Sequence, residues 1–159
     1  MKHQIKRLGR HEAALAEKVI RAFKGMSRSL DSLEAFLGNP ANYLLIAEAG
    51  DEAAGFLMAY RLERADREAG QMFVYEIGVT AAWRGQGLGT ALVEEITALA
   101  RAEGMFEAFV LTSRGNEAAR RLYACTGGRI EDDSAVLFVY PFGAVEPRAV
   151  RRAKARSQR

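Results

Sequence analysis

The sequence predicts an α/β fold built on a mixed β-sheet, and three observations support this. Two apolar segments, 43–48 and 53–62, flank a turn-like stretch, as in a β-hairpin. From residue 72 onward, segments typical of strands alternate with segments typical of helices. The apolar residues of 88–99 recur every three or four positions, as on one face of a helix. A hairpin followed by alternating strands and helices is typical of a sheet with both parallel and antiparallel pairs.

The first forty residues predict one strand and two helices. Gln4 to Leu8 is the predicted strand. A helix from His11 to Lys24 follows, since its apolar residues have a helical period and Gly25 is suited to end it. Either Ser29 or Asp31 is suited to cap a second, short helix, which ends at Gly38-Asn39-Pro40.

The remaining elements complete the sheet and its helices. The hairpin consists of Tyr43–Glu48 and Ala53–Leu62, and the charged stretch 63–70 predicts a loop. The elements predicted after this loop are a strand at Met72–Val79, a long helix ended by Gly104, a strand at Glu107–Thr112, a helix at Asn116–Ala124 and a last strand at Ala135–Pro141. We expect one domain over residues 1–143, because 159 residues suit a single core.

The net charge of +3 is concentrated at one end of the chain. Residues 148–159 carry six cations and no acid, which leaves 17 basic and 20 acidic side chains, a net charge of −3, in the rest. We interpret 144–159 as a solvated basic tail, although such a tail also suits an acidic partner. The acidic body favours a cationic substrate over a nucleic acid.

Other classes are disfavoured by composition. No apolar run is long enough to span a membrane, and the N-terminal residues lack the apolar core of a signal peptide. The single cysteine, Cys125, excludes an internal disulfide and disfavours a metal cluster. We therefore expect a cytoplasmic protein without a metal.

A glycine-rich turn lies between a predicted strand and a predicted helix. Glycines alternate with other residues in Arg84-Gly85-Gln86-Gly87-Leu88-Gly89, and Thr90 follows. A helix start presents unpaired N–H groups, and glycines let an anion approach them, so the turn suits a pyrophosphate. The spacing differs from a Rossmann fingerprint, and the Lys-Ser or Lys-Thr of a Walker A loop is absent from it.

This hexapeptide resembles the Q/R-x-x-G-x-G/A signature of the GNAT acetyltransferases. Two other segments agree with the resemblance. Tyr75-Glu76-Ile77-Gly78-Val79, before the turn, is like the family's fourth strand, and Asn116 to Tyr123, after it, is like the family's N-x-x-A-x-x-x-Y helix. The resemblance implies a GNAT fold, with a mostly antiparallel mixed sheet of about six or seven strands and about four helices. It also implies acetyl-CoA as co-substrate.

The resemblance assigns roles to individual residues. The turn from Arg84 to Thr90 would bind the coenzyme A pyrophosphate, and the backbone of Ile77, Gly78 and Val79 would receive the pantetheine arm where the fourth strand splays from the fifth. An N–H of Ile77 or Val79 would polarise the acetyl carbonyl, and Asn116 would bind the arm. Tyr123 would protonate the departing thiolate, although the residue alone indicates only a half-buried helix aromatic.

Glu76 is the candidate general base, since amine acetylation requires a deprotonated amine. A glutamate at this place also suits binding the substrate without accepting its proton, and Tyr75 either lines the acceptor site or belongs to the core. Cys125 is interpreted as passive, with direct transfer in a ternary complex. The loop Ala124-Cys125-Thr126-Gly127-Gly128 departs from the family pattern, which leaves its contacts open.

Within the family, the chain is similar to the short GNAT-type aminoglycoside 3-N-acetyltransferases. The similarity covers Asn42-Tyr43-Leu44, the aromatic strand 73–79, where Glu76 replaces an aspartate, and Ala118 to Tyr123. A polycationic amine needs carboxylates, and the cleanest acidic run is Glu131-Asp132-Asp133; Glu63, Asp66 and Glu68 are interleaved with arginines. We expect an aminoglycoside acceptor and a homodimer. The alternative acceptors are a polyamine, an amino acid or a protein amine, and the alternative of another class is a coenzyme-A-binding sensor without turnover.

Overall fold

The computed structural model describes residues 3–50, 52–132, 134, 136–140 and 142, and these divide into two units at Arg129/Ile130. The first unit contains every helix and strand of the described residues. Its strands are β1 (His3–Arg7), β2 (Asn42–Ala49), β3 (Glu52–Leu62), β4 (Gln71–Val79) and β5 (Glu107–Val110). Its α-helices are α1 (Ala13–Lys24), α2 (Leu30–Gly38), α3 (Leu88–Ala102) and α4 (Glu117–Cys125). Short 3₁₀ helices cover Arg10–Glu12 and Ala81–Trp83.

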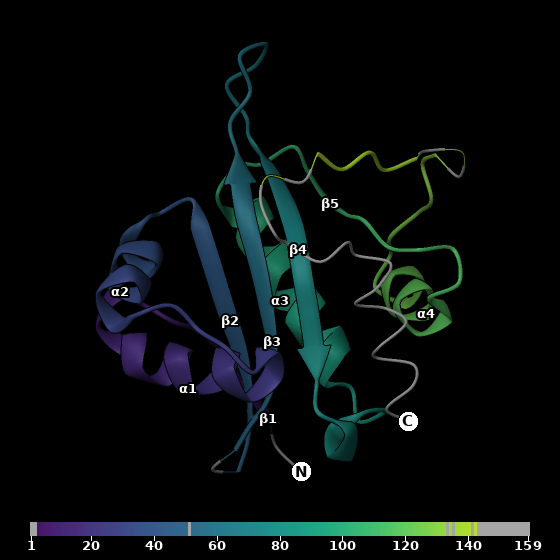
Figure 1. Ribbon diagram of the computed structural model, residues 1–159. Helices are drawn as coiled ribbons and strands as arrows, with labels where there is room; N and C mark the ends of the chain where they lie inside the picture. The colour runs from purple at the N-terminus through teal and green to yellow at the C-terminus, as the bar shows by residue number, and fades with distance from the viewer. Residues whose placement is uncertain (1–2, 51, 133, 135, 141, 143–159) are drawn as a thin grey trace. The chain divides into compact units, whose positions relative to one another are not determined.

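The five strands form one sheet in the order β1-β2-β3-β4-β5, shown in Figure 1. The first four pair antiparallel, and β5 pairs parallel to β4. A parallel neighbour requires a crossover, and α3 supplies it between β4 and β5. The predicted α/β fold with a mixed sheet and four helices is therefore confirmed, and so is the hairpin of β2 and β3.

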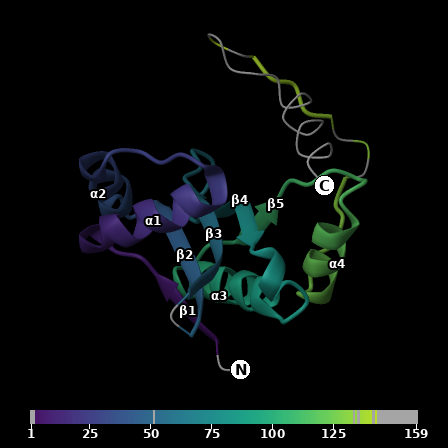
Figure 2. The ribbon, with the colours of Figure 1, turned by 60° about the horizontal axis from the view of Figure 1, so that its bottom comes forward.

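Two apolar cores lie on opposite faces of the sheet, with α1 and α2 over one face and α3 over the other (Figure 2). On the α3 face, Leu88, Leu92 and Ile96 are buried against alternate residues of β2 and β3. On the other face, Val19 of α1 and Leu33 of α2 pack on Ile46 and Phe56. These helices have one apolar stripe each, which the strands bury.

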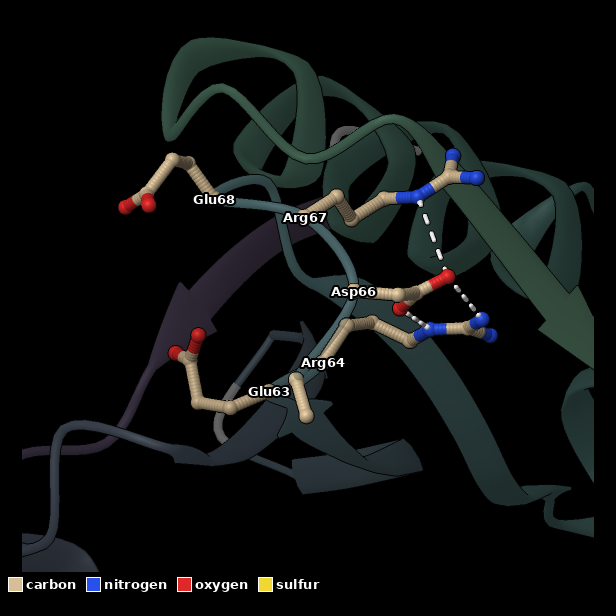
Figure 3. Close-up of a pocket in the computed structure, with 6 residues that line it drawn as sticks. Glu63, Arg64, Asp66, Arg67 and Glu68 are labelled. Atoms are coloured by element: carbon tan, nitrogen blue, oxygen red, sulfur yellow. Dashed lines mark hydrogen bonds and ion pairs between the residues drawn. The ribbon is translucent and has the colours of Figure 1, made fainter.

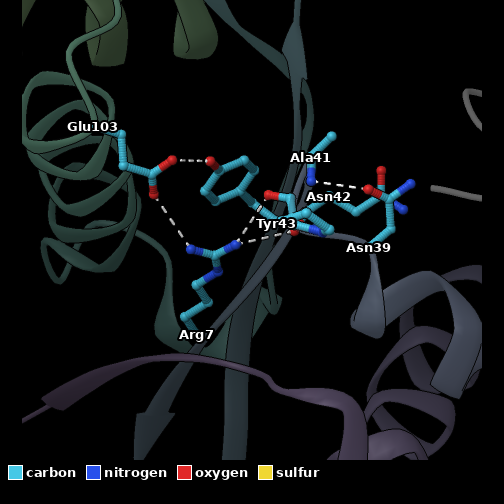
Figure 4. Close-up of polar contacts among 7 residues, drawn as sticks. Arg7, Asn39, Ala41, Asn42, Tyr43 and Glu103 are labelled. Carbon is cyan, nitrogen blue, oxygen red and sulfur yellow. Dashed lines mark hydrogen bonds and ion pairs between the residues drawn. The ribbon is translucent and has the colours of Figure 1, made fainter.

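A polar cluster joins β1, β2 and the end of α3, as Figure 4 shows. The hydroxyl of buried Tyr43 donates a hydrogen bond to Glu103, and the guanidinium of Arg7 lies 4.0 Å above the Tyr43 ring. Arg7 also forms an ion pair with Glu103 at 3.4 Å. The cluster anchors the edge strand β1 to both the sheet and α3.

The strand count is lower than predicted, with five strands rather than six or seven among the described residues. The predicted last strand, Ala135–Pro141, is the main difference, because residues 136–140 have no regular structure. Ala135 and Pro141 themselves lie outside the described residues. Val136, Leu137, Phe138, Val139 and Tyr140 are 59–78% exposed. Apolar and β-branched composition gives strand propensity, but a strand forms only where its backbone pairs with a neighbour.

None of the helices in the described part of the chain is long and apolar enough to cross a membrane.

Candidate active site

The glycine-rich turn follows β4 and leads directly into α3. Gly85 and Gly87 have φ of 75° and 85°, a left-handed conformation that L side chains rarely adopt. Because α3 begins at Leu88, the N–H groups of its first turn have no earlier helical carbonyl to bond. That turn contains no acidic residue. The arrangement is that of an anion site at a helix N-terminus.

The side chains of the turn brace it from outside. Nε of Arg84 donates to the carbonyl oxygen of Val79 at 3.2 Å, and Nε2 of Gln86 donates to that of Ala82 at 3.0 Å. Arg84 thereby ties the turn to the end of β4. The exposed face of the turn keeps its glycine backbone uncovered, since Gly85 and Gly87 have no heavy atom within 4 Å of where a Cβ would stand.

The second half of β4 is free of β5. The parallel ladder ends at the pair Val74 and Val110, and residues 75–79 of β4 continue beside β3 alone within the described residues. The Val79 carbonyl faces away from β3, since it accepts from Arg84, whereas the N–H of Thr80 bonds to Ala54 of β3. By the two-residue alternation of a strand, the N–H groups of Ile77 and Val79 face the open flank.

Gly78 lies at the same strand end but serves packing. A Cβ on Gly78 would come within 2.7 Å of the Phe56 ring and 3.2 Å of the Phe23 ring. The N–H and carbonyl groups of Gly78 face β3, so the N–H groups on the open flank are those of its two neighbours, Ile77 and Val79. The sequence groups Gly78 with the cofactor-binding residues, which stays a prediction, and the structure adds a steric reason for a glycine at this position.

Helix α4 joins the turn through Gly89. The space beside Gly89 is filled by Leu122, whose Cδ2 would lie 3.3 Å from an added Cβ, and by Val79 at 4.0 Å. Leu122 and Tyr123 are partly buried against the α3-side core. The three segments singled out in the sequence, the end of β4, the turn and the tyrosine helix, therefore meet at one point.

Tyr123 and Asn116 hold different places on α4. Burial raises the pKa of the Tyr123 phenol above its ordinary value, which keeps it protonated as a proton donor must be. Asn116 is the N-cap of α4, and its Oδ1 accepts from the Ala119 N–H at 3.2 Å. Cys125 is exposed; its Sγ donates to the Leu122 carbonyl at 3.1 Å and lies 4.0 Å from the Thr90 hydroxyl.

A β-bulge turns Tyr75 and Glu76 to the same face of the sheet. Met58 of β3 pairs with Glu76 and Ala59 pairs with Val74, so Tyr75 is the extra residue. Val74 and Ile77 pack on the α3 side, whereas Glu76 reaches α1 on the other side, where Lys24 donates a hydrogen bond to its Oε1. Glu76 thus lies on the opposite face from α3, beside the open flank of β4.

A row of aromatic rings extends from Tyr75 across this face. Tyr75 meets Tyr60 edge-on at 5.7 Å and Phe73 edge-on at 5.8 Å between ring centroids. Phe73 stacks on Phe109 of β5 at 4.9 Å. We call Tyr60, Tyr75, Phe73 and Phe109 the aromatic row. Tyr75, at the centre of the row, is 46% exposed.

Sequence reasoning missed Lys24 and most of this row. The apolar alternation of Phe73 and Tyr75 along β4 is visible in the sequence, but which face they share depends on the bulge. Lys24 is 52 positions from Glu76, and nothing in its local sequence marks it.

The acids of the β3–β4 loop are largely committed to neighbouring arginines (Figure 3). Asp66 accepts two hydrogen bonds from Arg64, at 2.7 Å each, and lies 4.0 Å from Arg67. The bond from Arg64 lowers the pKa of Asp66 to about 2. Glu63 pairs with Arg61, and Glu63 and Glu68 point away from the Asp66 cluster. The hollow formed by residues 63–68 is therefore a poor place for a polycation.

The other predicted acids belong to the second unit. Glu131 is exposed, Oδ1 of Asp132 accepts from the N–H and hydroxyl of Ser134 at 2.8 and 2.7 Å, and Asp133 lies outside the described residues. Their part in substrate binding stays a prediction. Among the described residues, no group of three His, Cys, Asp or Glu side chains is arranged to hold a metal ion.

Comparisons with known proteins agree with this geometry. The model of the acetyltransferase (GNAT) family matches residues 11–127. A search of curated proteins finds no match.

Solved structures give a more detailed picture. An aminoglycoside acetyltransferase, HMB0005, from an uncultured soil metagenomic sample is 26% identical, with 89% of this chain and 99% of that chain covered and a TM-score of 0.80. Another from such a sample, meta-AAC0020 in complex with sisomicin, is 24% identical over 88% and 96%, with a TM-score of 0.81. Ribosomal-protein-alanine N-acetyltransferase from Brucella melitensis biovar Abortus 2308 is 20% identical over 88% and 100%, with a TM-score of 0.71. The last two likenesses concern the fold alone.

Proposed function

Because the chain belongs to the GNAT family of acetyltransferases and is an acetyl-CoA-dependent N-acetyltransferase, we propose that its acceptor is an aminoglycoside. The acetyl group passes directly to a primary amine in a ternary complex. The 3-amino group is favoured, because the strand that carries Tyr75 and Glu76 is similar to that of the aminoglycoside 3-N-acetyltransferases. The observation that carries this proposal is the placement of Glu76. It lies on the face opposite α3, next to the unpaired flank of β4, and the aromatic row begins beside it.

The donor side is assigned to the turn and the open flank. The N–H groups at the start of α3 and the glycine backbone from Gly85 to Gly89 bind the pyrophosphate, with Arg84 and Thr90 beside them. The N–H groups of Ile77 and Val79 receive the pantetheine arm and polarise the acetyl carbonyl, and the side-chain amide of Asn116 binds the arm. Donors held on a strand need no reorganisation as charge develops on the carbonyl oxygen.

The acceptor side is assigned to Glu76 and Tyr75. An alkyl ammonium is mostly protonated at neutral pH, so Glu76 takes its proton, directly or through one water. Tyr123 gives a proton to the departing thiolate, and its phenol carries that proton at neutral pH. The chemistry therefore uses one group on each side of the open flank of β4.

The aromatic row supports an acceptor that carries a ring and further ammonium groups. Tyrosine faces attract ammonium groups by about 0.5–2 kcal/mol each, depending on exposure. The face carries Lys24 and, near Tyr60, Arg28, beside the carboxylate of Glu76. A polycation is therefore held here by ring faces more than by clustered acids. A part for Glu131, Asp132 and Asp133 in binding the acceptor stays a prediction from the sequence.

A thiol-release assay tests the acceptor class. The protein is incubated with acetyl-CoA and matched panels of aminoglycosides, polyamines, amino acids and basic peptides. We expect turnover with aminoglycosides; turnover with peptides alone would assign the protein-acceptor alternative and end the aminoglycoside proposal.

Two variants test the assigned roles in the same assay. Glu76→Gln and Tyr123→Phe should each lower kcat by about 100-fold or more, because general acids and bases contribute about 100- to 10,000-fold. Both should keep the Kd for acetyl-CoA, measured by calorimetry. A weakened Kd with unchanged kcat would assign these side chains to cofactor binding instead.

We also propose a homodimer. The support is the run of exposed apolar side chains at Val136, Leu137, Phe138, Val139 and Tyr140, a surface that monomeric proteins rarely leave uncovered. Sedimentation of the full chain tests it, and a monomer at micromolar concentration would contradict it.

A further inference from the structure

The most informative contact outside the proposed chemistry is that of Lys24 with Glu76. Lys24 is the last residue of α1, and its Nζ donates a hydrogen bond to Oε1 of Glu76. Both side chains are partly exposed, at 43% and 30%. The primary amine of Lys24 is therefore hydrogen-bonded to the carboxylate of Glu76, which we assign as the base that deprotonates primary amines.

We propose that Lys24 is a site of self-acetylation. The inference rests on the proposed role of Glu76, and it uses the same donor, acetyl-CoA. A base acts when it is within hydrogen-bond reach of the proton that it removes, and Lys24 meets this condition without a bound acceptor. Its amine is also tethered by the fold, so it reaches the carboxylate without the entropy cost of a second molecule.

The transfer balances as an ordinary amide synthesis. The Lys24 ammonium gives one proton to Glu76, and the resulting amine bonds to the acetyl carbonyl carbon. The carbon–sulfur bond breaks, and its electron pair leaves with the sulfur. The nitrogen loses a second proton as the amide forms. One of the two protons ends on the coenzyme A thiol and the other in solvent.

A second lysine provides a control inside the same molecule. Lys6 forms an ion pair with Glu12, and the side chains of that pair are 41% and 28% exposed, almost the values of Lys24 and Glu76. Glu12 lies in the 3₁₀ helix after β1, which packs against α1 and α2. Random chemical acetylation depends on exposure and pairing, so it should treat the two lysines similarly, whereas enzymatic transfer should not.

Acetylation of Lys24 would change the charge on the face of the sheet that carries Glu76 and the aromatic row. Acetyl-lysine is neutral and no longer forms an ion pair with a carboxylate. The modification removes one positive charge beside the aromatic row and releases Glu76 for an incoming ammonium. A cationic acceptor should then bind more tightly.

Mass spectrometry tests the proposal. The full chain is incubated with acetyl-CoA without an acceptor, and acetyl occupancy is followed at Lys24 and Lys6 after digestion. We expect Lys24 to be acetylated about ten-fold or more faster than Lys6, at a rate independent of protein concentration because the reaction is intramolecular. Equal rates at the two lysines, or a rate that rises with protein concentration, would overturn it.

Two variants sharpen the result. Glu76→Gln should reduce the rate at Lys24 to that at Lys6 while leaving Lys6 unchanged, and an unaffected Lys24 rate would count against the proposal. Lys24→Arg keeps the positive charge and cannot be acetylated. Preincubation with acetyl-CoA should lower the acceptor KM of the unmodified sequence, but not that of Lys24→Arg.

The outcome separates this inference from the proposed acceptor. If aminoglycosides are acetylated while Lys24 stays unmodified, self-acetylation is wrong and the proposed acceptor stands. If Lys24 is acetylated but aminoglycosides are not, the proposed acceptor is wrong and self-acetylation stands. If neither reaction occurs, both are wrong.

Discussion

Leu122 of α4 fills the space beside Gly89 of α3, where Cδ2 of Leu122 would lie 3.3 Å from an added Cβ. The contact matters because Tyr123 is the next residue of α4 and the turn into α3 is the proposed pyrophosphate site. Position 89 therefore sets how closely the proposed proton donor approaches the proposed cofactor.

Gly89→Ala and Gly89→Val should differ sharply. A methyl group meets only the end of a flexible leucine, which can yield by a few tenths of an ångström, so Gly89→Ala should keep its activity. Valine adds two further methyl groups, and such overpacking costs about 1–3 kcal/mol and would displace α4. We expect Gly89→Val to lower kcat, with partial recovery in Gly89→Val/Leu122→Ala. Equal kcat for the alanine and valine variants would contradict this account.

Gly87 is required for a different reason, its backbone conformation. Its φ of 85° costs an L residue about 1–2 kcal/mol, while no atom would touch a Cβ there. Gly87→Ala should therefore lower the free energy of unfolding, measured in denaturant, and weaken acetyl-CoA binding. Gly115→Ala is the matched control, because that glycine also has open space but no positive φ. The account fails if the two variants are equally stable.

The elements that the sequence predicted well are those with local determinants. Helix α3 is an example. Its helical period, seen at Leu88, Leu92 and Ile96, and the glycines at its two ends are signals that can be recognised within a few positions of the chain. The helix begins and ends close to the predicted bounds. The cap of α2 is similar: of the two candidates, Ser29 accepts the N–H of Ser32.

The features that the sequence missed depend on pairing between distant segments. The face that Glu76 occupies follows from the bulge at Tyr75, and a bulge is a property of two strands in register. The contact with Lys24 requires α1 to end above β4. The strand predicted at 135–141 had the right composition, but composition cannot supply the neighbour with which a strand pairs.

Tyr43→Phe should alter the response of stability to alkaline pH. Burial, together with the bond to Glu103, raises the pKa of the Tyr43 phenol to about 12 from its ordinary value of 10.0. The unfolded chain therefore loses this proton first, and the stabilisation is complete below about pH 10 and lost as pH rises through about 12. The difference in unfolding free energy between the parent and Tyr43→Phe should shrink across that interval. A constant difference from pH 9 to about 12 would show that the phenol does not contribute through its ionisation.

Tyr75→Leu tests whether the aromatic row binds the acceptor. Tyr75 is the exposed centre of the row and precedes Glu76, so an ammonium over its ring would also lie near the proposed base. Leucine keeps an apolar side chain on the strand but removes the π face. Loss of about 1 kcal/mol of cation–π attraction raises the acceptor KM roughly five-fold, and the KM for acetyl-CoA should not change.

Phe106→Leu is the control for Tyr75→Leu. Phe106 is also exposed, at 38%, but its ring is covered by the guanidinium of Arg67 at 4.2 Å and it stands outside the aromatic row. Its loss should leave both KM values unchanged. Tyr75→Phe keeps the ring and removes only the hydroxyl, so it should behave like the parent. If Tyr75→Phe raises the acceptor KM as much as Tyr75→Leu does, the hydroxyl rather than the ring face binds the acceptor.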